Sequence, residues 1–211
     1  MTYLEKIKKA QEIIKEALSS YKNICLASSF GKDSVVLMDL VLKEKKDIDI
    51  IVVISDTEFQ ETYDFIDNFS NKLNINFKKY VFKNNPDKGV ESCCGEEKVR
   101  VFKDALIGYD AWFSGVRSTE GITRNNFSYI ENKGGLTKIN PILDFTELDI
   151  WKYIALNNLE TNPKYRDGYR SLSCSICSTP ELNEQESERS GRWRGSKKEC
   201  GECGIHTQSL R

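Results

Sequence analysis

The chain has 211 residues, a formal net charge of −1, 39% hydrophobic residues and 30% charged residues. These values are typical of one globular α/β domain, and they provide no global basic field for nucleic acid, so a nucleic-acid partner is not implied. The longest apolar run, IDIIVVIS, is far too short to span a bilayer, and no membrane association is expected.

The N-terminal sequence MTYLEKIKKAQEI has the pattern of a charged helix and not that of a signal peptide. We therefore expect the reducing cytoplasm as the compartment. In that compartment the seven cysteines are expected to be ligands or catalysts and not structural disulfides. The sequence leaves open whether the chain forms homo-oligomers.

Apolar segments alternate with amphipathic segments along most of the chain. This alternation, with β-branched residues in the apolar runs, predicts a doubly wound, mostly parallel α/β sheet, whose ligands bind beyond the carboxyl ends of the strands. Cys25 is expected to be a buried hydrophobic residue of the first strand. Helices are predicted after a Thr2 cap and at residues 30–43, 61–73, 96–106 and 146–158, and strands at residues 23–29, 48–56, 75–82, 111–116 and 138–143.

The composition changes after Pro180. The segment ELNEQESERSGRWRGSKKECGECGIHTQSLR is polar and poor in apolar residues. We therefore expect residues 1–180 to form the α/β domain and residues 181–211 to form a polar, mobile tail or lid.

The segment SSFGKDS follows the first predicted strand and opens a helix. Small residues let backbone N–H groups approach a ligand, and the N-terminus of a helix favours an anion. The segment is not a Walker A loop, because the first glycine is missing and Asp33 intervenes before Ser34. An ordinary turn is the alternative, but a second polar turn, SDTEFQET, follows the next strand at the same sheet edge and favours a nucleotide site. The candidate binding residues are Ser28, Ser29, Gly31, Lys32, Asp33, Ser34 and Asp56.

Two cysteine pairs suggest a metal site. Cys93 and Cys94 are adjacent, and Cys174 and Cys177 form a C-x-x-C pair about eighty residues later. Four thiols can make a tetrahedral site for zinc or for an iron–sulfur cluster, and the spacing alone does not choose between these metals. Unrelated free thiols are the alternative.

A second C-x-x-C pair, Cys200 and Cys203, lies in KKECGECGIHT. Neighbouring positive charges favour the thiolate form of a cysteine, and such a thiolate on a mobile tail can act as a nucleophile towards a bound ligand. A structural pair is the alternative. The only histidine, His206, need not be catalytic.

The pattern as a whole resembles the adenylyl-sulfate and phosphoadenylyl-sulfate reductases of sulfate assimilation, over about residues 28–206. SSFGKDSVVL is similar to their modified pyrophosphatase loop, and SDTEFQETYDF to their D-T-G…F-P-E-T-Y element. CCGEEKVRVFKDALIGYDAWFSGVRSTEGITR, KINPILDFTELDIWKYI, NPKYRDGYRSLSCSIC and GRWRGSKKECGECGIH resemble further family segments. The resemblance implies an adenine nucleotide alpha hydrolase-like fold.

In the cluster-bearing branch of this family the two cysteine pairs hold a 4Fe-4S cluster. The resemblance therefore implies that Cys93, Cys94, Cys174 and Cys177 are its ligands and that Lys98 lies beside it. The branch that uses phosphoadenylyl sulfate usually lacks these cysteines, so adenylyl sulfate is the expected substrate.

The implied reaction is the reduction of adenylyl sulfate to sulfite and AMP. Cys203 is expected to attack the sulfate sulfur and form an enzyme S-sulfocysteine, from which thioredoxin or a similar dithiol releases sulfite. Arg117, Arg124 and Lys138 match basic positions of the family's anion site.

The chain departs from the family at three places. Glu97 replaces an arginine, the SDTEFQET turn lacks the family's glycine and proline, and the E-C-G motif is duplicated. Only Cys203 continues into G-I-H, and Cys200 is hypothesised to resolve an intermediate. The alternatives are a phosphoadenylyl-sulfate reductase, an ATP pyrophosphatase-type nucleotide transferase such as the sulfate adenylyltransferase small subunit, and a non-catalytic metal–sulfur protein.

Overall fold

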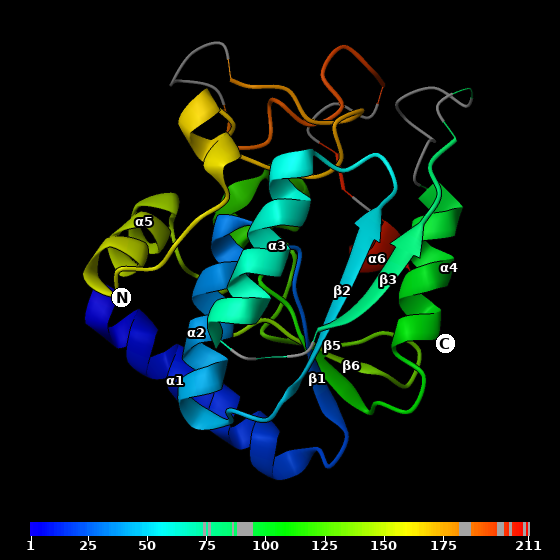
Figure 1. Ribbon diagram of the computed structural model, residues 1–211. Helices are drawn as coiled ribbons and strands as arrows, with labels where there is room; N and C mark the ends of the chain where they lie inside the picture. The colour runs from blue at the N-terminus through cyan, green and yellow to red at the C-terminus, as the bar shows by residue number, and fades with distance from the viewer. Residues whose placement is uncertain are drawn as a thin grey trace.

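The computed structural model describes residues 1–73, 75, 77–85, 87, 95–181, 187–197, 201, 202, 204–208 and 210. Within these residues a six-stranded sheet has the order β3-β2-β1-β4-β6-β5 (Figure 1). Its neighbouring strands are parallel, except that β5 pairs antiparallel with β6. The strands are β1 (Ile24–Ala27), β2 (Asp49–Ser55), β3 (Lys78–Phe82), β4 (Ala111–Phe113), β5 (Ile130–Asn132) and β6 (Thr137–Ile139).

Helices cover both faces of the sheet. One face packs against α1 (Tyr3–Ser20), α2 (Lys32–Glu44), α3 (Gln60–Leu73) and α5 (Glu147–Leu156) in the larger apolar core, and the other packs against α4 (Gly95–Ala105) and α6 (Gly204–Thr207). Figure 1 shows α3 and α4 on opposite sides of β2 and β3. The predicted doubly wound α/β fold is thus confirmed.

The alternation of side chains along a strand explains how a single strand contributes to both apolar cores. In β1, Ile24 and Leu26 face the larger core, whereas Cys25 faces the smaller core beside α4. Successive side chains of a strand point to opposite faces, so the apolar run is buried on both sides. The prediction that Cys25 is a buried hydrophobic residue is confirmed, because its exposed fraction is 0%.

The helix starts follow local sequence. Thr2 caps α1 in a capping box with Glu5, and Thr146 caps α5 in a capping box with Asp149. Each pair satisfies backbone N–H groups that the first turn of a helix leaves without partners.

Among the described residues, three short 3₁₀ helices lie in the loops at the carboxyl end of the sheet or next to it. They are η2 (Ser118–Glu120), η3 (Ile122–Arg124) and η4 (Pro163–Asp167).

Some elements differ from the sequence prediction. The edge strand β5 was not predicted, because it has three residues, two of them exposed, and therefore carries no apolar alternation. The last two predicted strands, which correspond to β4 and β6, end earlier than predicted. β4 ends before Gly115, and β6 ends before Pro141, which lacks a backbone donor.

The C-terminal segment packs more closely than its polar composition suggests. Within residues 187–197, Glu188, Arg189, Arg192 and Trp193 are all buried, and a short bridge joins Ser178 to Arg192. The division at residue 180, and the mobility of the tail, stay predictions.

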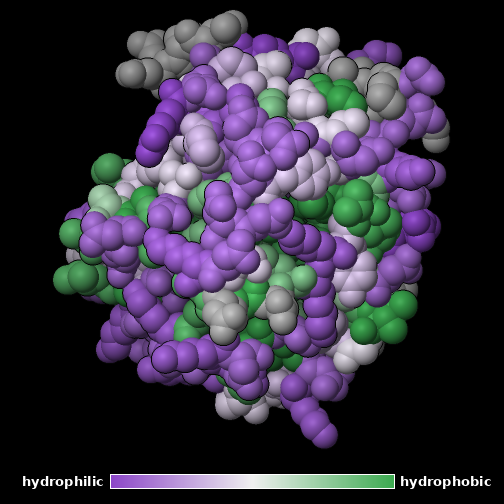
Figure 2. All heavy atoms as spheres, viewed as in Figure 1, coloured by the Kyte–Doolittle hydropathy of each residue, from purple (hydrophilic) through white to green (hydrophobic). Residues whose placement is uncertain are grey.

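The face of the molecule in Figure 2 is mostly hydrophilic, with hydrophobic side chains in small, separate patches. Among the described helices, none is both long and apolar enough to cross a bilayer.

Candidate functional site

A cavity of about 170 Å³ lies beyond the carboxyl ends of the central strands. Its walls come from the loops after β1, β2 and β4, from α4, from residues 162–173 and from the C-terminal segment. From β1 the chain adds β2 and β3 on one side of the sheet, and it then returns to add β4, β5 and β6 on the other side of β1. The cavity therefore lies where the strand order reverses. This is where open α/β sheets bind ligands.

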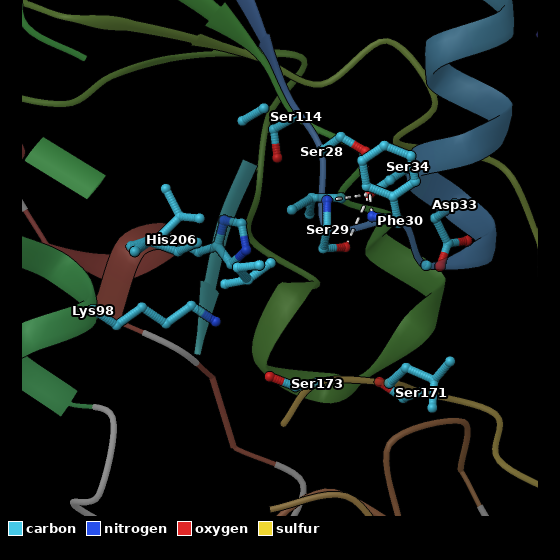
Figure 3. Close-up of a pocket in the computed structure, with 18 of the residues that line it drawn as sticks. Ser28, Ser29, Phe30, Asp33, Ser34, Lys98, Ser114, Ser171, Ser173 and His206 are labelled. Atoms are coloured by element: carbon cyan, nitrogen blue, oxygen red, sulfur yellow. Dashed lines mark hydrogen bonds between the residues drawn. The ribbon is translucent and has the colours of Figure 1, made fainter. Parts of the chain in front are cut away.

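The loop after β1 forms one wall of the cavity. Ser29 Oγ and Ser34 Oγ are 3.0 Å apart, and the backbone N–H of Ser29 donates to Ser34 Oγ at 3.3 Å (Figure 3). Phe30 has a φ of +55° and is fully buried. Its ring contacts Phe65, Phe69 and Phe77 edge-on, which holds the left-handed residue in place.

Two close contacts fix the start of α2. Gly31 precedes this helix and supplies no side-chain cap, and the backbone N–H of Lys32 donates to the Tyr165 hydroxyl at 2.7 Å. A side chain at Gly115 would lie 3.3 Å from backbone atoms of Asp33 and Ser34, so glycine lets the loop after β4 approach closely.

Lys32 does not line the cavity. Its side chain is 1% exposed, and its Nζ donates to the carbonyl of Arg170 at 2.5 Å and lies 3.2 Å from Glu188. Burial opposes the charged form, but Asp33 and Glu188 outweigh it and raise the pKa of Lys32 above its usual value. The predicted loop cation therefore links the loop to the C-terminal segment.

Arg117 is fully buried in the same network. Its Nε donates to Asp33 at 2.5 Å, and its two terminal nitrogens both donate to the carboxylate of Glu188. Arg117 and Lys32 thus both form ion pairs with Glu188.

Two other predicted residues also lie outside the cavity lining. Asp56 is exposed and accepts the backbone N–H of Asn84 at 2.9 Å. Lys138 is fully buried, 3.1 Å from Glu131, and burial lowers its pKa to about 8. The contributions of Lys32, Asp56, Arg117 and Lys138 to substrate binding stay predictions. Of the predicted binding residues, Ser28, Ser29, Gly31, Asp33, Ser34 and Arg124 do line the cavity.

The described cavity lining is balanced in charge. Acidic residues on it include Glu58, which takes the position of the family's glycine in the turn after β2. Burial, opposed by Lys98, raises the pKa of Glu58 to about 7. Arg189 and Arg192 were not predicted as site residues, because they lie in a segment that has the composition of a solvated tail. The cations are Lys98, Arg124, Arg189 and Arg192, and the acids are Asp33, Glu58, Glu120 and Glu202.

Four residues with nearly buried side chains form a compact network at one side of the cavity. Arg124 Nε donates to Glu202 at 2.5 Å, its NH2 donates to the same carboxylate at 3.2 Å, and its NH1 pairs with Glu120. Arg189 lies 3.2 Å from Glu120 and 3.5 Å from Glu202. Burial opposes the charged form of Glu202, but Arg124 outweighs it and lowers its pKa to about 2.

His206 lies across the cavity from the serines of the loop after β1, on the same side as Lys98 (Figure 3). Burial lowers its pKa well below the usual value, so the ring is neutral at pH 7. Its Nδ1 has no hydrogen-bond partner among the described residues and is buried. No role was predicted for this histidine from the sequence.

Cys174 and Cys177 lie next to the cavity with their sulfur atoms 3.4 Å apart, and both are buried beside Trp193. Arg192 NH2 donates to Cys177 Sγ at 3.4 Å. The hydrogen bond from Cys174, together with Arg192 and Lys98, lowers the pKa of Cys177 to about 5. Two converging buried thiols with cations beside them fit one half of a metal–thiolate site.

Cys93, Cys94, Cys200 and Cys203 lie outside the described residues. No group of metal-binding residues is complete within the part of the chain that the structure describes. The described neighbours of Cys203 nevertheless reach the cavity, since Glu202, Ile205 and His206 line it.

Comparisons with known proteins agree with this geometry. Residues 23–180 match the family described as phosphoadenosine phosphosulfate reductase domain. An adenosine 5'-phosphosulfate reductase of Oceanobacillus iheyensis is 35% identical, over 94% of this chain and 88% of its own length.

Two solved structures share the fold. A phosphoadenylyl-sulfate reductase of Candida auris in a phosphate complex has a TM-score of 0.64 at 21% identity, over 79% of this chain and 88% of that one. A U34-tRNA thiolase of Methanococcus maripaludis with its 4Fe-4S cluster has a TM-score of 0.53 at 17% identity, over 75% of this chain and 65% of that one.

Proposed function

This chain belongs to the phosphoadenosine phosphosulfate reductase family, and we propose that it reduces adenylyl sulfate to sulfite and AMP in sulfate assimilation. One observation carries this proposal. Glu202, Ile205 and His206, which lie on both sides of Cys203 in the sequence, line the cavity, and Figure 3 shows His206 across it from the loop after β1. A nucleotide in this cavity would therefore lie between the loop and the segment that bears the nucleophile.

The charge of the cavity favours adenylyl sulfate over phosphoadenylyl sulfate. The four cations of the described lining face four acidic residues, of which Glu58 has a pKa raised to about 7. The described lining therefore carries little surplus positive charge for an additional phosphate group. The curated relative with 35% identity is also named for adenosine 5'-phosphosulfate. Phosphoadenylyl sulfate is the second candidate substrate.

The proposed reaction balances over three displacement steps. The Cys203 thiolate attacks the sulfate sulfur, a sulfur–sulfur bond forms, and AMP leaves with the electron pair of the broken sulfur–oxygen bond. A thiolate of thioredoxin, or of a similar dithiol, then attacks Cys203 Sγ, and sulfite leaves with the electron pair of the sulfur–sulfur bond. The second donor thiol releases Cys203 and completes a donor disulfide, which accounts for the two electrons. Reduced dithiols of this kind are available in the cytoplasm, where we place the reaction.

We propose that Cys93, Cys94, Cys174 and Cys177 hold a 4Fe-4S cluster. The buried pair Cys174 and Cys177, with Arg192 on one sulfur, supports this assignment. When bound, the cluster would supply electrostatic tuning and structural support next to the substrate. Lys98 lines the cavity and lowers the pKa of Cys177, so its ammonium group acts on both the cluster side and the substrate side.

The proposal is tested on protein purified without oxygen. Iron content and the visible spectrum are recorded, and sulfite is then measured from each of the two sulfonucleotides with thioredoxin present. We expect iron, and faster sulfite release from adenylyl sulfate. A protein that releases pyrophosphate from ATP and forms no sulfite would instead be a nucleotide transferase.

A further inference from the structure

We infer that Glu202 is a positioning residue. Its carboxylate is bound by Arg124 and Arg189, and these contacts hold the chain next to Cys203 against the cavity. The inference rests on the proposed function, in which Cys203 is the nucleophile. It concerns a residue to which neither the composition nor the motifs gave a role.

Several contacts hold Glu202 and the residue before it in place. Arg124 binds both carboxylate oxygens, from Nε at 2.5 Å and from NH2 at 3.2 Å. Arg189 lies 3.5 Å from the carboxylate and donates from NH2 to the carbonyl of Gly201 at 2.6 Å. Side chain and backbone are thus held at two successive residues, immediately before Cys203.

The side chains that make these contacts are also nearly buried, and their charges balance. The side chains of Arg124, Arg189, Glu120 and Glu202 are between 4% and 7% exposed, and the two arginines face two carboxylates. A buried, multiply hydrogen-bonded pair of this kind is costly to break, because it leaves an uncompensated charge. An exposed ion pair such as Lys72–Glu160 contributes little by comparison.

A second anchor lies on the other side of Cys203. A Cβ placed at Gly204 would come within 2.8 Å of Val99 of α4, and Ile205 packs against the smaller apolar core. The ion pairs of Glu202 and the apolar packing of α6 therefore hold the chain on both sides of Cys203, the proposed nucleophile. A side chain that must reach a sulfate sulfur needs this kind of restraint, since small misplacements cost large factors in rate.

The same contacts have one rival interpretation. In that interpretation, the Glu202 carboxylate competes with the substrate anion for Arg124 and Arg189. Competition predicts that loss of the carboxylate lowers KM, whereas positioning predicts that it lowers kcat. The two interpretations therefore differ in a measurable way.

The test compares Glu202→Gln, Glu202→Asp and a control, Glu160→Gln, which neutralises an exposed acid of similar size. Glu202→Gln leaves Arg124 its pair with Glu120, so we expect a folded protein, checked by its melting temperature. We expect kcat for sulfite release to fall about 10- to 100-fold with KM within about twofold, and Glu202→Asp to recover part of the loss. An unchanged kcat, or a lower KM at constant kcat, would overturn the inference.

A second measurement needs no activity. Hydrogen exchange of the segment 201–208, without substrate, should be faster in Glu202→Gln than in the wild type and in Glu160→Gln. If the wild type released no sulfite from either sulfonucleotide, the proposed function would fail. Exchange alone would then decide whether Glu202 holds the segment, and unchanged exchange would overturn that role.

Discussion

The hydroxyl of Tyr165 accepts the backbone N–H of Lys32 at 2.7 Å and so joins η4 to the first turn of α2. Tyr165 also lines the cavity. It therefore caps a helix whose preceding residue, Gly31, has no side chain for the purpose. One of the N–H groups that a phosphate would meet at this helix start is already occupied by the protein.

Tyr165→Phe should lower the free energy of unfolding by about 1–3 kcal/mol, because it leaves a buried N–H group without its acceptor. The matched control is Tyr109→Phe, which removes a hydroxyl that donates to Asp49 at 2.7 Å in an exposed pair. We expect the control to cost less than about 1 kcal/mol. Urea unfolding measures both values, and equal losses would contradict the capping role of Tyr165.

Lys138 makes stability depend on pH. Its pKa falls from 10.5 to about 8 on folding, mainly because of burial, so between these values the unfolded state binds more protons than the folded state. Stability should therefore rise with pH from about 8 to 10.5, by about 3 kcal/mol.

Lys138→Met should remove this rise, because no titrating group remains at the position. Urea unfolding at pH 8, 9 and 10 compares the slopes of the two proteins. A rise of the same size in Lys138→Met would assign the pH dependence to another group.

Cys174→Ser should remove most of the iron, because it takes away one of the four proposed ligands. Cys25→Ala is the matched control, since Cys25 is an equally buried cysteine within the sheet. Iron content and the visible spectrum after anaerobic purification give the answer. If Cys174→Ser kept as much iron as Cys25→Ala, the assignment of Cys174 as a ligand would be wrong.

Cys200→Ser tests the hypothesis that Cys200 resolves an intermediate within the protein. We expect this variant to release sulfite more slowly at limiting thioredoxin, because the donor would have to carry out the step alone. Normal turnover at every thioredoxin concentration would exclude a resolving role.

The fold could be predicted from the sequence because the apolar segments of β1 and β2 bury residues on both faces of the sheet, and that pattern is local. β5 could not be predicted in this way, since its pairing with β6 depends on a contact and not on its own composition. The loop after β1 was located correctly at the cavity for the same local reason.

The pairing of the charged residues in the site was harder to predict from the sequence. Lys32 and Arg117 look like ligand-binding cations in the sequence, yet both pair with Glu188, which is distant from each of them along the chain. Arg189 and Arg192 reach the cavity from a segment whose composition resembles a solvated tail. Charge pairs between distant segments leave no periodic signal, so only the folded structure shows which cations are paired.

Cys203 is proposed to attack the sulfate sulfur of adenylyl sulfate. The most direct measurement is the intact mass of the protein after incubation with adenylyl sulfate, without a dithiol donor. We predict that the wild type gains the mass of one SO₃ group and releases one equivalent of AMP, that thioredoxin then removes the added mass as sulfite, and that Cys203→Ser, still containing iron, does neither. A Cys203→Ser protein that acquired the same adduct, or that released sulfite at the wild-type rate, would show that Cys203 is not the nucleophile.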